Sequence, residues 1–166
     1  MGRKPRDKSS DLLIATRLAG ATAAYLAANR VVRNVSMDGR HDEGKGHIML
    51  PSRKKGAQHG RWLSDIDIMT TFAGSIAVDG FSRRKSEFDP ARVDRDVEDL
   101  AQSVTGSEAE RDAYLRWLWE RALCVFNKPG IIHFVGFIAD ELVEKRTVDG
   151  NRVKEIYDNV IRAAAK

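Results

Sequence analysis

The sequence has few of the features that define secreted or membrane proteins. Its 166 residues include a single cysteine, Cys124, so no disulfide can form within the chain, which favours a reducing compartment. The first ten residues are charged and lack the apolar core of a signal peptide. The apolar stretch 12–28 is short for a membrane span and is interrupted by Arg17. These absences predict a soluble, cytoplasmic protein without a membrane span.

The sequence also has no internal repeats, heptad arrays or low-complexity tracts. No Ser-His-Asp or Cys-His arrangement can be assembled from local sequence, so nothing predicts a nucleophilic enzyme. What is present is typical of a globular protein: 42% of the residues are hydrophobic and 31% are charged. A chain of this length can bury a core of its own. We predict a flexible basic tail over residues 1–10, followed by one domain over residues 11–166.

Periodicity and boundary signals predict a mainly helical (α+β) fold. We expect helices over 12–28, 63–81, 90–104, 108–126, 131–143 and 151–165. Residues 31–37 are rich in β-branched side chains and predict a strand, which a second strand over 47–50 would join in a small β-hairpin. Small side chains at Ala19–Ala24 would let another backbone approach closely, so we expect the first helix to be central and tightly crossed.

Several single residues carry their own expectations. Cys124 lies in the apolar run 122–126, and His133 lies in the apolar run 131–135, so we expect both in the core. Trp117 and Trp119 stand two positions apart on a predicted helix and therefore face different ways. One of them should pack in the core, and the other could mark a partner surface.

Several segments occur in an order that is similar to a known family. They are the run Arg17-Leu18-Ala19-Gly20-Ala21, the strand segments 32–37 and 46–51, the helical segment 72–77, the acidic segment 95–98, and residues 142–156. In this order they resemble the peptidase domain of FtsH-type ATP-dependent zinc metalloproteases, particularly its small stand-alone relatives. The resemblance implies a zincin-like, mainly helical domain with a small β-hairpin.

The residues that would carry the family's chemistry are replaced. In the family's His-Glu-x-x-His motif, two imidazoles at i and i+4 bind zinc and the glutamate is the general base. Arg17, Leu18 and Ala21 stand at these three positions, whereas Asp96 matches the segment that supplies the third ligand. A guanidinium has no lone pair for a metal, and leucine and alanine have no donor atom. The resemblance, with these departures, implies a degenerate site without catalytic zinc or another cofactor.

Two hypotheses follow from the resemblance. Arg17 would form an ion pair with Asp96, or with the neighbouring Asp94 or Asp99, because a partly buried carboxylate without its metal is costly. The alternative is that Arg17 simply lies on the exposed edge of its helix. The chain would act as a pseudo-peptidase, a module that binds a protein or peptide partner or regulates one. An extended peptide would add to the strand His47, Ile48, Met49 and Leu50, since strand addition uses backbone hydrogen bonds and needs no metal.

Two alternatives remain open. One is a zinc-dependent peptidase or another hydrolase with a non-standard metal site. The other is a nucleic-acid-binding protein, because the net charge is +4 and basic residues gather in the tail and over 53–61. The partner and the oligomeric state are not encoded in any recognisable motif.

The glycine-rich segment 39–46 suggests two further sites, neither of which we favour. His41, Asp42, Glu43 and His47 would hold a metal only adventitiously, because ordering such a turn opposes binding. The segment also approaches the phosphate-binding pattern Gly-x4-Gly-Lys-Ser/Thr. Gly46 replaces the hydroxyl residue, however, and a strand follows in place of a helix, so a hairpin turn is favoured.

Overall fold

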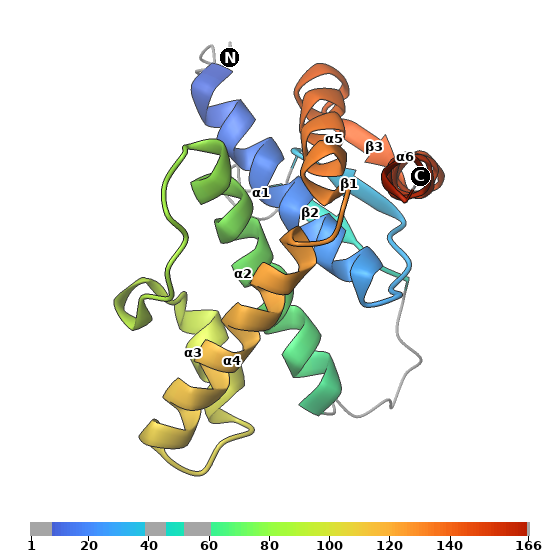
Figure 1. Ribbon diagram of the computed structural model, residues 1–166. Helices are drawn as coiled ribbons and strands as arrows, with labels where there is room; N and C mark the ends of the chain where they lie inside the picture. Colours follow the sequence, from blue (N-terminus) through green and yellow to red (C-terminus); the bar gives the residue numbers. More distant parts are fainter. Residues whose placement is uncertain (1–7, 39–45, 52–60, 166) are drawn as a thin grey trace.

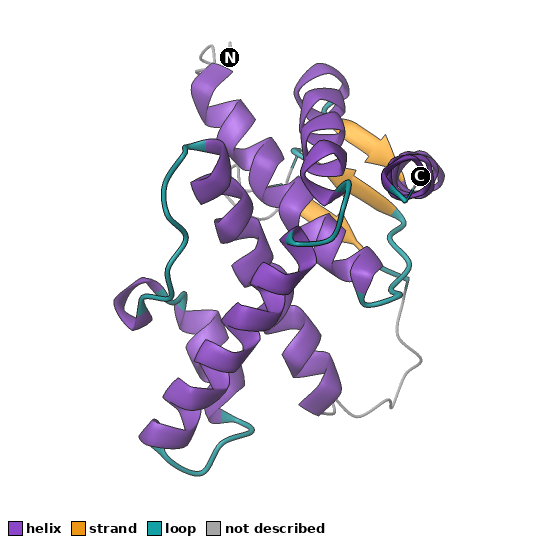
Figure 2. Ribbon diagram, in the orientation of Figure 1, coloured by secondary structure: helices purple, strands orange, loops and turns teal. Residues whose placement is uncertain are grey.

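The computed structural model describes residues 8–38, 46–51 and 61–165. Within these ranges the chain forms six α-helices, one 3-10 helix and three short strands (Figure 1). In chain order they are α1 (Lys8–Ala27), β1 (Asn34–Ser36), β2 (His47–Met49), α2 (Arg61–Phe81), a 3-10 helix (Pro90–Arg92), α3 (Arg95–Gln102), α4 (Glu108–Phe126), α5 (Ile131–Lys145), β3 (Thr147–Asp149) and α6 (Gly150–Ala164). Helix dominates and the strands form one small sheet, which confirms the predicted fold class (Figure 2).

Helix α1 lies at the centre and is crossed tightly by α2, as its small residues predicted. A Cβ atom added to Gly20 would stand 2.5 Å from Cβ of Ala77 and 2.7 Å from the carbonyl oxygen of Ala73. Such distances are well inside van der Waals contact, so only glycine fits at this crossing. In Figure 1, α5 packs beside α1, and α4 crosses α2. The two central helices therefore join α5, which packs on α1, to α4, which packs on α2.

Apolar side chains form two buried clusters. The first joins α1, the sheet, α5 and α6 and includes Val35, Phe134 and Leu142. The second joins α2, α3 and α4 and includes Phe72 and Trp119. Trp119 is buried whereas Trp117 is exposed, so the expectation that the two tryptophans face different environments is confirmed.

The sheet is antiparallel, in the order β2-β1-β3. Val35 of β1 is opposite Ile48 of β2 on one side and Val148 of β3 on the other. The first two strands confirm the predicted hairpin, but β3 was not foreseen: residues 147–149 lie between two helices, and the strand forms by pairing with β1, which is distant in sequence. Gly150 fixes the end of β3: its N–H donates to the carbonyl oxygen of Arg33 at 2.7 Å.

Two predicted helix boundaries were wrong. Helix α1 begins at Lys8, so residues 8–10 belong to the domain and not to the tail. The third predicted helix is divided into a 3-10 turn capped by Asp89 and a separate α3, because Val93 and Asp94 are extended between them. By contrast, α4 begins after the side-chain cap Ser107 and spans the predicted residues. Both capping residues therefore mark a helix start, but the helix that Asp89 caps is only a short 3-10 turn.

The burial expected for two residues was also wrong: Cys124 and His133 are both exposed. The buried residues of α4 include Ala122 and Val125, and those of α5 include Ile131 and Phe134. Cys124 and His133 lie beside these stripes on the outward face. An apolar run in sequence is longer than the stripe that a helix can bury, because only part of each turn faces the core.

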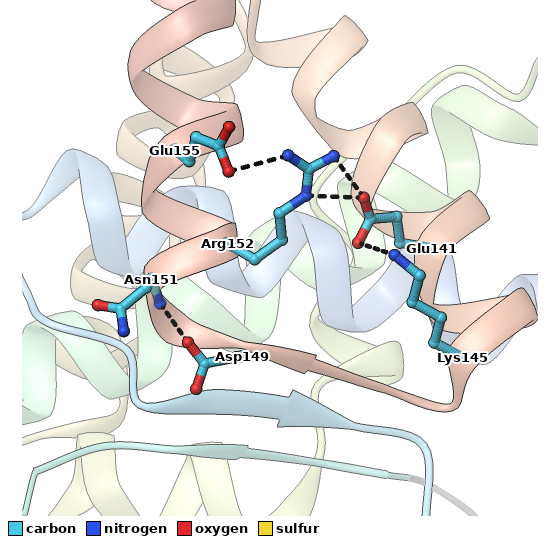
Figure 3. A network of polar contacts seen from close by, with 6 residues as sticks. All are labelled: Glu141, Lys145, Asp149, Asn151, Arg152 and Glu155. Atoms are coloured by element: carbon cyan, nitrogen blue, oxygen red, sulfur yellow. Dashed lines mark hydrogen bonds and ion pairs between the residues drawn. The ribbon is translucent and has the colours of Figure 1, made fainter.

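Polar contacts join the C-terminal elements, as Figure 3 shows. Oε1 of Glu141 on α5 accepts from Nε and Nη2 of Arg152 on α6, at 2.9 and 2.8 Å. Its Oε2 accepts from Nζ of Lys145 at 3.2 Å. The hydrogen bond from Arg152 lowers the pKa of the Glu141 carboxyl. At the end of α5, Arg146 pairs with Asp11 of α1 at 3.0 Å, so the C-terminal part is held to the central helix.

Within the described ranges, no single helix is long and apolar enough to cross a membrane. Helices α4 and α5 meet the length and composition requirement only together, as a pair bent by 86°.

Candidate functional site

A cleft of about 270 Å3 lies between α1, α2 and the edge strand β2. It contains Arg17, Leu18 and Ala21, the three positions that the resemblance aligns with the zinc motif, together with His47 and Ile48 of the predicted peptide-binding strand. Met49, Leu50 and Asp96 do not line it. The other lining residues are Tyr25, Gly46, Thr70, Thr71, Gly74, Ser75 and Asp94. The tertiary structure thus brings together segments that are far apart in the sequence.

Helix α1 forms an apolar wall with a positive charge at its edge. The stem of Arg17 packs on α2, since a Cβ added to Gly74 would stand 2.9 Å from its Cγ. Arg17 as a whole is exposed, so the stem packs while the guanidinium remains accessible to water. Leu18 is buried against the start of β2, where Gly46 has a positive φ of 70°.

Helix α2 contributes a polar wall that the sequence analysis missed. The hydroxyls of Thr70 and Thr71 donate to the carbonyl oxygen of Asp67 at 2.9 and 3.0 Å. Ser75 donates to the carbonyl oxygen of Thr71 at 3.4 Å. Because each hydroxyl proton is used within the helix, the oxygens keep lone pairs that can accept from a ligand. The i, i+4 spacing of Thr71 and Ser75 is the sequence signal that could have identified this wall.

Asp94, and not Asp96, is the carboxylate of the cleft. Asp94 lies immediately before α3 and lines the cleft, whereas Asp96 is exposed on α3. In the described part of the chain, Arg17 forms no ion pair with Asp94, Asp96 or Asp99, so the predicted pairing was wrong. All three aspartates are exposed, so the burial that would have required a cationic partner is absent.

Strand β2 borders the cleft with one edge unpaired. It hydrogen-bonds only to β1 among the described strands, because β1 is the central strand of the sheet. His47 is exposed, Met49 is 44% exposed and Ile48 is half-buried, so no described side chain covers the strand completely. An unpaired strand edge presents backbone N–H and C=O groups that can pair with another extended chain.

A smaller pocket of about 50 Å3 adjoins the cleft along α2. Thr71, Ser75 and Asp94 line both spaces. The pocket has an aromatic wall in which the ring centroids of Phe72 and Trp119 are 5.3 Å apart and those of Phe72 and Phe88 are 6.2 Å apart. The buried carboxylate of Asp79 also lines this pocket.

Among residues 8–38, 46–51 and 61–165, no group of three His, Cys, Asp or Glu side chains could hold a metal ion. Most of the glycine-rich segment, including His41, Asp42 and Glu43, lies outside the described residues. The basic residues 53–55 also lie outside them.

Comparison with known proteins does not assign the chain to a family. No protein-family model matches the sequence, and neither does any curated protein. The resemblance to the FtsH-type peptidase domain therefore remains a prediction from the order of the motifs.

Proposed function

We propose that the protein is a pseudo-peptidase, a non-catalytic module that binds an extended peptide along the edge of β2. One observation carries the proposal: an edge of β2 that pairs with no other described strand borders a cleft whose α1 wall consists of Arg17, Leu18 and Ala21. The strand edge offers a way to bind a peptide. The α1 wall offers no group that could activate water, because a leucine stands where the resemblance expects the general base.

The physical basis of binding is strand addition. Each new backbone hydrogen bond contributes about 1 kcal/mol net. Because β2 has three residues, only a few such bonds can form, and the cleft must contribute further contacts. Alternate side chains of an added strand would point into the cleft, toward the hydroxyl oxygens of Thr71 and Ser75. This arrangement supports a short peptide segment as the ligand.

A hydrolase is the second candidate, and it has weaker support. Ser75, His47 and Asp94 line the same cleft, which is the set of residue types that nucleophilic catalysis uses. No hydrogen bond joins any two of these three among the described residues. Ser75 instead donates to its own helix. The cleft therefore favours binding over catalysis.

The test measures peptide binding at individual backbone amides. Amide chemical shifts of the isotope-labelled full chain are recorded while a random mixture of acetylated, amidated hexapeptides is added. We expect shifts at Gly46, His47 and Ile48. A second mixture carries N-methyl groups on every other amide. It should bind more weakly when the methylated amides are those that face β2, because N-methylation removes the donors that pair with a strand edge. Equal binding of both mixtures would contradict strand addition.

Variants and mass spectrometry complete the test. Replacing Ile48 by proline should abolish the shifts, because proline removes a donor and disturbs the strand. The matched variant Ile48→Val should retain them. Mass spectra of the peptides should show no cleavage, with or without a metal chelator. Chelator-sensitive cleavage would instead support a metallopeptidase, and cleavage that a chelator does not change would support another hydrolase.

A further inference from the structure

The small pocket beside the cleft contains a buried carboxylate with weak polar contacts. The Asp79 side chain is only 7% exposed. Its Oδ2 accepts from the Ser86 hydroxyl at 3.5 Å, and its Oδ1 lies 4.0 Å from Nη2 of Arg92. Both distances are at the outer limit of such interactions, and the Arg92 side chain is 65% exposed. A buried carboxylate normally has closer compensation, because removing a charge from water is costly.

The surroundings of Asp79 favour a cation. Glu87, Asp89 and Asp94 also line the pocket, and Arg92 is the only positively charged residue among its described lining. The rings of Phe72, Phe88 and Trp119 form its apolar part. An ammonium group interacts favourably both with a carboxylate and with aromatic rings.

We infer that this space, which we call the Asp79 pocket, receives the ammonium group of a lysine side chain of the bound peptide. The inference rests on the proposed function, since the peptide main chain must lie in the adjoining cleft. Lysine carries a compact charge at the end of a four-carbon stem, which can extend past Thr71 and Ser75 into a narrow space. A volume of about 50 Å3 accommodates such a group more readily than a planar guanidinium.

The inference assigns a role to each part of the pocket. Asp79 accepts hydrogen bonds from the ammonium group, and the aromatic rings exclude water from the pair. Arg92 competes with the ligand for the same carboxylate. The lysine ammonium group of the peptide therefore gives the Asp79 carboxylate, which is already buried in the free protein, a closer positive partner.

The experiment compares two acetylated, amidated hexapeptides that differ at one position. One carries lysine in the middle of an alternating Ala-Val sequence, and the other carries norleucine, which has a similar stem without the charge. Binding is followed by tryptophan fluorescence in a Trp62→Phe/Trp117→Phe variant, in which Trp119 is the only tryptophan. We expect the lysine peptide to bind about tenfold more tightly, the effect of one hydrogen bond to a charged group.

Three variants in the same background make the assignment specific. Asp79→Asn keeps the shape of the side chain and should remove the preference for lysine while the norleucine peptide still binds. Arg92→Ala removes the competing cation and should strengthen the preference. Glu144→Gln removes an exposed carboxylate of α5 outside the pocket and should change nothing.

The outcomes separate this inference from the proposed function. Equal affinity for the two peptides, or a lysine preference that persists in Asp79→Asn, would overturn the Asp79 pocket and leave strand addition intact. If neither peptide binds, and the random mixture also fails to shift the amides of β2, the proposed function fails and this inference fails with it. Should Asp79→Asn not fold, the Arg92→Ala variant decides: an unchanged preference would count against the inference.

Discussion

Leu18 of α1 and Gly46 at the start of β2 are in close contact. A Cβ atom on Gly46 would stand 2.6 Å from Cδ1 of Leu18 and 2.7 Å from the carbonyl oxygen of Ser36. Both residues line the cleft, so the contact brings the start of β2 directly against the central helix at this site. It also gives Leu18, the residue at the expected general-base position, a packing role. Such a role explains a leucine at this position without any catalytic function.

Replacing Gly46 by alanine should therefore both destabilise the protein and weaken peptide binding. The positive φ of 70° disfavours a residue with a Cβ, and the added atom meets both α1 and β1. We expect a loss of about 2 kcal/mol or more in the free energy of unfolding, measured by urea denaturation. Combining Gly46→Ala with Leu18→Ala should not restore stability, because the Ser36 carbonyl remains in place. Full recovery in the double variant would show that the side-chain contact alone matters.

Two glycine-to-alanine substitutions, one at the crossing of α1 and α2 and one on α5, should change the free energy of unfolding in opposite directions. Gly20→Ala should destabilise the protein by about 1–3 kcal/mol, because the methyl group overpacks the contact with Ala73 and Ala77. Gly136→Ala is the matched control: apart from its chain neighbours and the backbone of its own helix, no heavy atom of the described residues lies within 4 Å of the position of its Cβ. It should stabilise helix α5 by about 0.5–1 kcal/mol. Urea unfolding of both variants tests the sign, and a harmless Gly20→Ala would contradict the close crossing.

Introducing two histidines into the cleft should create a metal site. In an Arg17→His/Ala21→His variant, two imidazoles stand at i and i+4 on one helix, in the cleft that Asp94 lines. We expect one zinc per chain by calorimetry, with a third ligand from Asp94. Adding Asp94→Asn should weaken zinc binding, whereas adding Asp96→Asn should not. The reverse result would support the assignment that the sequence resemblance suggested.

The contact between Glu141 and Arg152 predicts pH-dependent stability. Because the hydrogen bond from Arg152 lowers the pKa of Glu141 in the folded protein, this carboxylate stabilises the fold at neutral pH. Its contribution is lost as the pH falls through the folded pKa. Glu141→Gln should cost about 1 kcal/mol near pH 7, and the difference from the parent should shrink toward about pH 2.

The control for this prediction is Glu155→Gln, since Glu155 is more exposed and contacts only one Nη atom of Arg152. Its effect should be smaller. Urea denaturation across the pH range measures both variants. A Glu141→Gln difference that stayed constant with pH would mean that packing, and not charge, accounts for the loss.

Cys124 should react with a thiol reagent in the native protein. Its side chain is on the exposed face of α4, although the apolar run around it suggested burial. We expect one thiol per chain to react with Ellman's reagent at a rate close to that of the unfolded chain. Protection until denaturant is added would place the residue in the core and would contradict the observed orientation of α4.

Local sequence was sufficient for most of the secondary structure. Ser107 caps the start of α4, and Pro129 and Gly130 lie between α4 and α5, so both boundaries coincide with signals in the local sequence. These signals act within a few residues, which is why they can be read without the fold. The small residues of α1 predicted a close helix crossing for a similar reason, because side-chain size limits how near two backbones can come.

The cleft was only partly predictable. Arg17, Leu18 and Ala21 were identified through their order in the chain, and His47 and Ile48 through a strand pattern. Asp94 lines the cleft in place of Asp96 because Val93 and Asp94 are extended between the 3-10 helix and α3. The hydroxyl wall depends on which face α2 turns toward α1, and the glycine contacts at the crossing determine that face.

The sequence by itself determined where the helices and two of the strands form, because hydrophobic periodicity, side-chain size and capping groups act between near neighbours in the chain. The tertiary structure alone decided that β3 pairs with β1, that Cys124 and His133 face water, and that Asp79 is buried beside the cleft. Each of these depends on contacts between segments that are distant in sequence, and the energy of such contacts exists only once the helices have packed.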